Sequence, residues 1–202
     1  MTKTKGMPLL LAMAMGLGAW GSAAEAAPAF MHTGGRTTQP VGHYEFCRRE
    51  PDECRQKTAS QMPIELTKIL WAAMVDINNT VNVMVSPRTD MEIWGKEELW
   101  SYPTKVGDCE DYALEKRRQL MDIGVPAGDL LMTVVRQPNG DGHALLTVRT
   151  SRGDFILDNL ESRVLAWTDT DYTYLKRQSE KNSGTWVAIN DSRSAVAVGS
   201  VK

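Results

Sequence analysis

The sequence lacks an excess of positive charge, internal repeats and low-complexity tracts. Its 202 residues carry 23 lysine and arginine side chains against 25 aspartate and glutamate side chains, a net charge of −2. A chain without surplus positive charge is poorly suited to binding phosphates, so no nucleic-acid partner is expected. Disorder is also disfavoured, because six tryptophans, five tyrosines and three phenylalanines supply apolar surface for a core. The length fits one globular domain with a short additional segment.

The one long uncharged stretch of the sequence stands near its start and has the features of a secretory signal peptide. Lys3 and Lys5 precede the apolar run Met7–Trp20, and small residues with an A-x-A cleavage site, Ala24–Ala26, follow it. The run is shorter than the roughly 20 residues that a membrane-spanning helix needs, which argues against the alternative of an uncleaved anchor. We therefore expect a signal peptide over 1–26, a periplasmic or secreted mature protein, and no membrane span after cleavage.

Cysteine is scarce, with three residues, and export changes how they are interpreted. Cys47 and Cys54 lie close together in the polar segment 27–62, whereas Cys109 stands apart. We expect a Cys47–Cys54 disulfide that clips 27–62 as an extended arm, and a free thiol at Cys109. The alternative is a zinc site that adds His43 as a third ligand, but its spacing matches no standard pattern.

Periodicity and turn residues predict an α+β domain over 63–202, with N-terminal helices packed on an antiparallel β-sheet. Across Pro63–Pro87, apolar residues recur at three- and four-residue intervals, as is typical of an amphipathic helix. A loop-rich stretch follows over 88–107, and a second helix is expected to begin near Asp108 and to end before Gly124. Four later runs have the composition of strands: Leu130–Arg136, His143–Arg149, Asp154–Leu157 and Trp186–Ile189.

Cys109 lies where a helix N-terminus would favour its reactive form. Asp108 is a good N-cap residue and places Cys109 at the first position of the second helix. The unpaired N–H groups and the dipole at that end stabilise a thiolate, which is the nucleophilic state of cysteine. Gly107 allows a close approach from outside. The alternative is a small apolar residue that is simply buried at the start of a helix.

Three acidic residues, Asp108, Glu110 and Asp111, surround this cysteine. Like charges raise a thiol pKa, so an active cysteine here needs a compensating cation: a histidine imidazolium, a metal ion or both. Hard carboxylate oxygens suit Ca²⁺, whereas one thiolate among carboxylates makes a poor zinc site. From the residues alone, the simpler interpretation is that these acids complement the helix dipole.

His143 is the candidate partner of the thiol, because the other two histidines, His32 and His43, fall in the arm. It opens a predicted strand after a glycine-rich turn, where an imidazole can face a cleft. If the next hairpin turns through Thr150–Gly153, Asp158 lies diagonally beside His143 on the same face of the sheet. Asp158 would then orient an imidazole that moves a proton as the thiol attacks a carbonyl carbon. A hydrogen-bonded strand histidine without a catalytic role is the alternative.

Several blocks of residues follow one another in a characteristic order. They are Asn78, Asn82, Trp94–Gly95, Trp100, Gly107–Ala113, Leu120–Pro126, Gly142–Leu146 and Leu157–Leu160. Together they resemble the bacterial transglutaminase-like cysteine protease family. The resemblance implies a papain- or transglutaminase-like α+β fold and a catalytic triad of Cys109, His143 and Asp158. It also implies calcium, held near the three acidic residues named above.

We therefore expect an exported, calcium-dependent cysteine peptidase whose substrate is a cell-surface or periplasmic protein. The same triad could instead pass an acyl group to an amine, as in a transglutaminase or amidase, and a non-catalytic calcium-binding adaptor is a further alternative. The segment around Cys47 and Cys54 is not part of the resemblance, so substrate identity stays open. Candidate oxyanion donors are the backbone N–H of Cys109 and the side chains of Trp94, Trp100 and Asn78.

Overall fold

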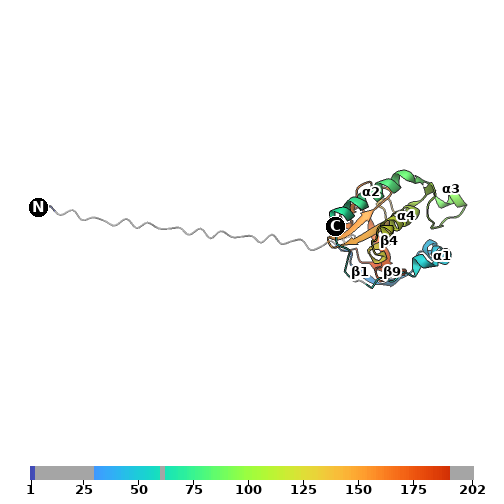
Figure 1. Cartoon of the computed structure of the whole chain (residues 1–202), viewed down its shortest axis with the longest axis horizontal. Helices are drawn as coiled ribbons and strands as arrows, with labels where there is room; N and C mark the ends of the chain where they lie inside the picture. Colours follow the sequence, from blue (N-terminus) through green and yellow to red (C-terminus); the bar gives the residue numbers. More distant parts are fainter. Residues whose placement is uncertain (3–29, 60–61, 192–202) are drawn as a thin grey trace, which may run out of the picture.

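A computed structural model of the protein describes residues 1–2, 30–59 and 62–191. The described chain forms one antiparallel sheet with helices packed on one of its faces (Figure 1). The helices are α1 (Val41–Arg49), α2 (Lys68–Met84), α3 (Asp90–Trp94) and α4 (Cys109–Asp122), with 3₁₀ helices at Pro51–Cys54, Ala127–Asp129 and Trp167–Asp169. The strands, in their order across the sheet, are β1 (Thr33–Thr37), β9 (Asn182–Ile189), β8 (Thr173–Ser179), β4 (Leu130–Arg136), β5 (Gly142–Thr150), β6 (Gly153–Leu157) and β7 (Leu165–Ala166).

Two further strands lie outside the large sheet, and most of the expected signal peptide lies outside the described residues. Strands β2 (Ser86–Pro87) and β3 (Val106–Gly107) pair in parallel outside the large sheet. The signal peptide expected over 1–26 lies, apart from its first two residues, outside the described residues. Within 30–59 and 62–191, no helix is long and apolar enough to cross a membrane.

Strands β4, β5 and β6 form the middle of the sheet and follow one another as hairpins. Gly153 adopts a φ of 124° in the second turn, a conformation that favours glycine. Beyond that turn Arg149 pairs with Asp154, and the register continues to Leu146 opposite Leu157. The pairing expected from the sequence is confirmed, and it brings the residue after β6 beside the start of β5.

The two longer helices build the main core against this part of the sheet. Helix α4 packs on β4 and β5, and α2 packs on α4. Helix α2 begins at Lys68, later than Pro63, because the Thr67 hydroxyl accepts the Leu70 N–H at 3.1 Å and caps the helix there. Buried side chains shared by the helices and the sheet include Leu70, Met74, Ile77, Val81, Leu114, Leu120, Met132, Leu146 and Leu157. The expected α+β class, with helices on an antiparallel sheet, is confirmed.

Residues 30–59 contain more regular structure than the extended arm expected over 27–62. Strand β1 pairs with β9 at the edge of the sheet. Helix α1 buries His43 and Phe46, and His43 contacts the indole ring of Trp186 edge to face. These buried aromatic contacts stabilise α1, because the helix covers the apolar side chain of Trp186 on β9. Neither β1 nor β8 was among the strands expected from composition.

Candidate active site

The N-terminus of α4 holds Cys109 in a tightly packed turn. Cys109 is the first residue of α4, as the sequence predicts, with Asp108 at the N-cap. The Asp108 side chain makes no capping hydrogen bond to α4; its Oδ2 accepts the N–H of Asp90 at 3.3 Å instead. Gly107 precedes this turn, and a Cβ there would lie 2.8 Å from the Cβ of Asp111. The close approach therefore requires glycine at position 107.

The thiol of Cys109 lies between α4 and β5. Its Sγ accepts the backbone N–H of Ala144 at 3.4 Å, and its S–H donates to Oε2 of Glu110 at 3.2 Å. Burial, and then the charge of Glu110, raise the thiol pKa above its ordinary value. Both influences favour the protonated thiol.

His143 and Asp158 form a buried pair at the start of β5 and the end of β6. Nε2 of His143 lies 2.8 Å from Oδ1 of Asp158, and both side chains are almost completely buried. Burial acts to raise the Asp158 pKa, but the hydrogen bond and charge of His143, with other donors, outweigh it and hold that pKa below its usual value. Since Nε2 is engaged by Asp158, the second ring nitrogen, Nδ1, is the one available to a thiol.

Cys109 and His143 line one cavity of about 370 Å³. The remaining lining residues are Pro40, Val41, Glu98, Trp100, Glu110, Val134, Gly142, Ala144 and Lys176. The structure therefore brings together the three residues expected to form the triad: Cys109 and His143 at one cavity, and Asp158 behind the imidazole. A nucleophile, a proton carrier and an orienting carboxylate in this order are suited to acyl transfer.

A group of three carboxylates lies beside the thiol. Asp90, Asp108 and Glu110 each offer an oxygen, and these oxygens lie within 4.8 Å of one another. Burial, followed by the charge of Asp108, raises the Glu110 pKa to about 9. Asp111 lies outside the group: its Oδ1 accepts the Ser101 N–H at 2.8 Å, and its pKa is raised to about 7, mainly by burial. Asp90 was missed because it stands 18 positions before Asp108, in the stretch expected to be a loop.

The carboxylate group fits a hard divalent cation. Oδ1 of Asp90 and Oδ1 of Asp108 are buried, and neither has a hydrogen-bond partner among the described residues. Buried polar atoms without a partner are costly, and a metal ion is one way to satisfy them. The donors are all carboxylate oxygens, a set that suits Ca²⁺ rather than Zn²⁺.

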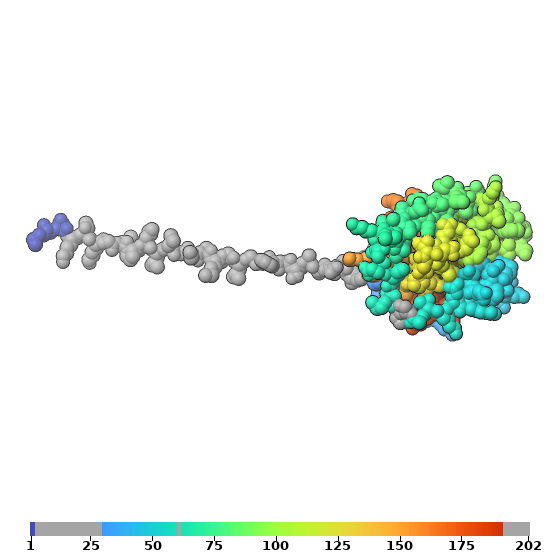
Figure 2. Space-filling view, in the orientation of Figure 1, coloured from blue at the N-terminus to red at the C-terminus, as the bar shows by residue number. Residues whose placement is uncertain are grey.

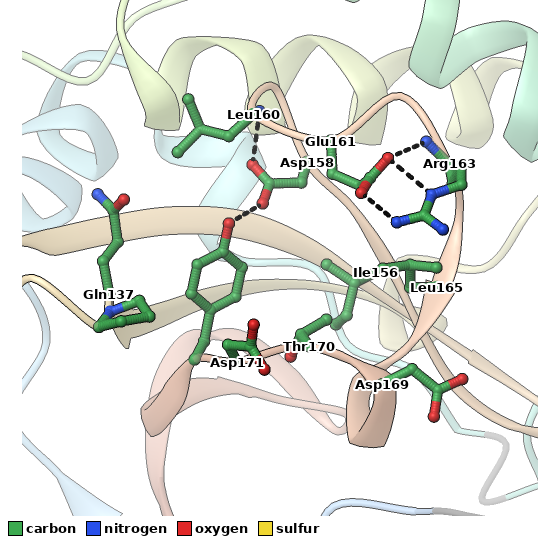
Figure 3. A pocket seen from close by; sticks show the side chains of 12 residues that line it. Gln137, Ile156, Asp158, Leu160, Glu161, Arg163, Leu165, Asp169, Thr170 and Asp171 are labelled. Carbon is green, nitrogen blue, oxygen red and sulfur yellow. Dashed lines mark hydrogen bonds and ion pairs between the residues drawn. The ribbon is translucent and has the colours of Figure 1, made fainter.

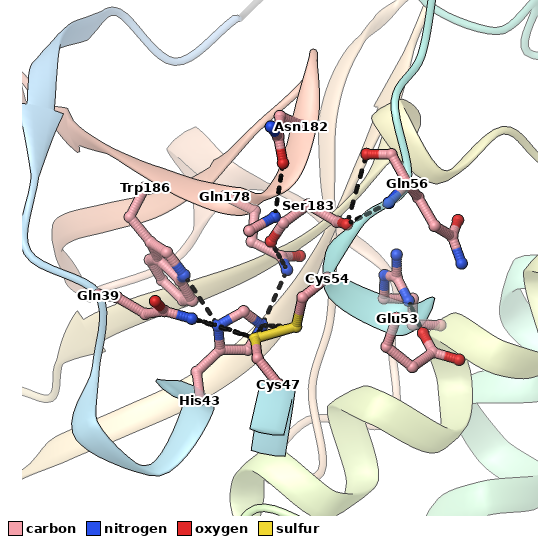
Figure 4. The surroundings of a disulfide bond; sticks show 12 residues. Gln39, His43, Cys47, Glu53, Cys54, Gln56, Gln178, Asn182, Ser183 and Trp186 are labelled. Carbon is pink, nitrogen blue, oxygen red and sulfur yellow. Dashed lines mark hydrogen bonds and ion pairs between the residues drawn. A yellow bond between two sulfur atoms is a disulfide. The ribbon is translucent and has the colours of Figure 1, made fainter. Parts of the chain in front are cut away.

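Residues 30–59, which contain the two remaining cysteines, contribute Pro40 and Val41 to the cavity. Cys47 and Cys54 are joined by a disulfide with their Cα atoms 5.5 Å apart, which leaves no thiolate for a zinc site with His43. His43 accepts the Trp186 indole N–H at 3.2 Å beside the disulfide (Figure 4). The Arg49 guanidinium donates to the Trp100 carbonyl at 2.6 Å.

This segment lies against the helices that carry the other site residues. Figure 2 shows the cyan surface of α1 adjoining the yellow surface of α4 and the green surface near α3. Pro40 and Val41, immediately before and at the start of α1, thereby reach the cavity of Cys109. This proximity to Cys109 was not predicted, because nothing in the spacing of residues 30–59 relates them to the second helix.

Of the candidate oxyanion donors, two are engaged elsewhere. Asn78 donates both of its side-chain hydrogen bonds to the carbonyls of Glu161 and Ser162, at 3.0 and 3.1 Å. The Trp100 indole lines the cavity but donates to Glu98 at 3.1 Å. The remaining backbone candidate, the N–H of Cys109, lies at the start of α4, where helix N–H groups have no intrahelical partner.

Comparison with known proteins defines the class of this molecule. A family model described as bacterial transglutaminase-like cysteine proteinase, BTLCP, matches residues 33–194, including much of the segment that the sequence resemblance left out. The chain is similar to the solved structure of Legionella pneumophila LapG, with 27% identity and a TM-score of 0.50, over 65% of this chain and 74% of that chain. It is also similar to calcium-bound Legionella pneumophila LapG, with 23% identity and a TM-score of 0.51, over 75% and 82% of the two chains. No curated protein matches the chain.

The fold and these matches define a cysteine peptidase with a transglutaminase-like fold. The chain belongs to the bacterial transglutaminase-like cysteine proteinase family, whose model spans most of its length. The family resemblance, the fold and the enzyme class expected from the sequence are all confirmed.

Proposed function

We propose that this peptidase is exported and hydrolyses peptide bonds of a protein substrate with Cys109 as nucleophile, His143 as proton carrier and Asp158 as the residue that orients the imidazole. The observation that carries the proposal is the buried contact of 2.8 Å between Nε2 of His143 and Oδ1 of Asp158. That contact leaves Nδ1 for the thiol that shares the cavity with His143.

In the first half-reaction, Cys109 gives its proton to Nδ1 of His143, and Sγ attacks the carbonyl carbon of the scissile bond. A C–S bond forms, and the carbonyl electron pair moves onto oxygen, where the Cys109 N–H at the start of α4 would stabilise the negative charge. The intermediate collapses when the C–N bond breaks, and the proton on His143 passes to the leaving amine. The product of this stage is a thioester on Cys109.

In the second half-reaction, His143 removes a proton from a water molecule that attacks the thioester carbon. The C–S bond breaks, the released thiolate recovers its proton from His143, and the new carboxyl terminus leaves. Asp158 keeps the imidazole in one tautomer and orientation throughout, and its charge stabilises the imidazolium that forms in each stage.

The proposal includes calcium held by Asp90, Asp108 and Glu110. A bound Ca²⁺ supplies positive charge that offsets the carboxylates beside the thiol, which favours the thiolate. The unpartnered buried oxygens of Asp90 and Asp108 support this assignment, and so does the existence of a calcium-bound structure of a relative with this fold. Asp111, also expected from the sequence, would support the group indirectly by holding the backbone at Ser101.

The proposal that the protein is exported is supported by the N-terminal sequence and by the Cys47–Cys54 disulfide. A disulfide persists in the periplasm or outside the cell and is rare in the cytosol. An apolar run with a cleavage site at Ala24–Ala26 supports secretion by the same route. A peptidase in that compartment would meet periplasmic and cell-surface proteins, which we propose as its substrates.

The test uses the purified protein, Cys109→Ala and Cys109→Ser, each incubated with calcium or with EGTA. The probe is a library of peptides made by digesting a bacterial proteome. We expect new N-termini and new C-termini, identified by mass spectrometry, only with the unsubstituted protein, and more of them with calcium. Two peptides joined to each other, with a mass equal to their sum less one ammonia, would indicate acyl transfer from a side-chain amide to an amine instead. Cleavage that survives in both cysteine variants would overturn the proposal.

A further inference from the structure

Tyr172 contacts the carboxylate that orients the candidate catalytic histidine. The residue lies just before β8, and its phenol O–H donates to Oδ2 of Asp158 at 2.6 Å (Figure 3). Burial, followed by the hydrogen bond and charge of Asp158, raises the pKa of Tyr172. The phenol therefore stays protonated at neutral pH and is a hydrogen-bond donor there.

The Asp158 carboxylate is held at both of its oxygens. Oδ1 faces Nε2 of His143 at 2.8 Å and also accepts the Leu160 N–H at 3.0 Å. Oδ2 is held by Tyr172, so rotation of the carboxylate would break hydrogen bonds on both sides. A carboxylate fixed in this way fixes the imidazole ring that it binds.

The ring of Tyr172 also packs against the imidazole. The ring centroids of Tyr172 and His143 are 5.6 Å apart, with an angle of 53° between the planes. Tyr172 and Asp158 line a second cavity, of about 380 Å³, whose lining does not include Cys109 (Figure 3). The phenol occupies the hydrogen-bonding position at Oδ2 of Asp158 that a water molecule in this cavity would otherwise take.

We propose that Tyr172 is a positioning residue of the peptidase: its phenol holds Asp158, and its ring backs His143, in the orientation that proton transfer with Cys109 requires. The inference rests on the proposed function, because it takes Cys109, His143 and Asp158 as the triad. Nothing in the sequence pattern pointed to this tyrosine, which lies in a connection without strand or helix periodicity.

Other charged groups also act on Asp158, and the test has to allow for them. Lys116 of α4 is buried, and Asp158 attracts its charge. Glu161, in the loop after Asp158, repels the Asp158 charge. Both groups stay in place when only the phenol oxygen of Tyr172 is removed, so a change in that variant reports on the hydrogen bond.

The experiment compares Tyr172→Phe with Tyr174→Phe in the purified protein. Tyr174 is a matched control because it is buried two residues further along, and its phenol bonds Thr170 at 3.0 Å rather than Asp158. We expect Tyr172→Phe to lower kcat about tenfold or more, because a hydrogen bond to a charged group is lost. We expect KM to change little, since the phenol does not line the cavity of Cys109.

The pH profile distinguishes positioning from a general loss of stability. Without the phenol donor the Asp158 carboxylate protonates more easily, so the acidic limb of kcat/KM should move to higher pH. Replacing Tyr172 with 3-fluorotyrosine, which has a more acidic phenol and is a stronger donor, should move the limb the other way. Thermal melting of each variant shows whether it is folded at the assay temperature.

The outcomes separate this inference from the proposed function. If Tyr172→Phe keeps kcat within twofold of Tyr174→Phe and has the same pH profile, while Cys109→Ala and Asp158→Ala are inactive, the role of Tyr172 is wrong and the triad stands. If Cys109→Ala or Asp158→Ala remains active, the triad itself is wrong and the inference falls with it.

Discussion

Oε2 of Glu110 lies 3.2 Å from Sγ of Cys109, the residue immediately before it in the chain. A helix N-terminus normally favours a thiolate, yet here burial and the neighbouring carboxylate raise the thiol pKa. The two influences oppose each other at one atom. Which of them prevails depends on what neutralises the Glu110 carboxylate, so this contact links the proposed calcium site to the proposed nucleophilicity of Cys109.

Alkylation of Cys109 should therefore depend on calcium and on His143. We expect iodoacetamide to label Cys109 faster with calcium than with EGTA at pH 6–8, because a cation on the carboxylates favours the reactive thiolate. His143→Ala should lose most of the fast labelling. Mass spectrometry of the labelled peptide provides the rate. Slow labelling in all conditions, with an ordinary or raised apparent pKa, would identify a structural thiol and favour a binding protein.

Substitution of Gly107 should disturb the start of α4. In Gly107→Ala the new Cβ would meet the side chain of Asp111 at 2.8 Å and Pro103 at 3.2 Å, so the turn has to shift. We expect the free energy of unfolding to fall by about 1–3 kcal/mol and activity to fall with it. Gly35→Ala is the control, since nothing lies within 4 Å of a Cβ there. Equal stability of the two variants in urea denaturation would contradict the expectation.

Helix α2 should influence catalysis through the loop that carries Asp158. The side-chain amide of Asn82 donates to the Asp158 backbone carbonyl at 2.8 Å. Asn82→Ala removes that donor and should cost about 1–3 kcal/mol of stability, with a lower kcat, because a largely enclosed carbonyl is left without its partner. Asn79→Ala, at an exposed position of the same helix, should change neither. Thermal melting and peptide hydrolysis measure the two effects.

Acid should destabilise the protein through His43. Burial, and then the charge of Arg117, lower the His43 pKa to about 3. A histidine with a depressed pKa in the folded state contributes stability above about pH 6.5, and that contribution disappears as the pH falls towards 3. The full difference amounts to about 5 kcal/mol.

The measurement is the free energy of unfolding between pH 7 and pH 3. His43→Gln removes the titrating group, so its stability should fall less steeply with acidity than that of the unsubstituted protein, whatever its value at pH 7. His32→Gln, at an exposed position, is the control and should keep the original slope. Parallel curves for all three proteins would show that His43 is not responsible.

The elements that the sequence predicted well depend on neighbours close in the chain. The start of α4 at Cys109 lies where the sequence predicts it, directly after Asp108, although the Asp108 carboxylate accepts the Asp90 N–H and does not cap the helix. The placement of Asp158 beside His143 follows from a short turn and the two-residue period of strands. Both signals act over a few residues, which is why the candidate nucleophile and its candidate partners could be named together.

The parts that the sequence did not reveal depend on distant contacts. Asp90 joins Asp108 and Glu110 only after the chain folds, although the Thr89–Glu92 capping box was a readable sign of the short helix that carries Asp90. Strand β1 is polar and glycine-rich, so it has no strand signature and exists because β9 offers it an edge. The role proposed for Tyr172 depends on its hydrogen bond to Oδ2 of Asp158, which forms only in the folded chain.

The pairing of β1 with β9 has a consequence for the order in which the enzyme is assembled. The Arg36 guanidinium of β1 donates to the Thr185 hydroxyl of β9, 149 positions later in the chain. Because the N-terminus of a polypeptide is made first, β1 cannot pair with β9 until nearly the whole domain has been synthesised. Contacts between residues so distant in the chain also carry a large loop-closure entropy cost. Pro40 and Val41, directly behind β1, line the cavity of Cys109. A partly emerged chain would therefore lack one wall of its cleft until β9 is available to pair with β1.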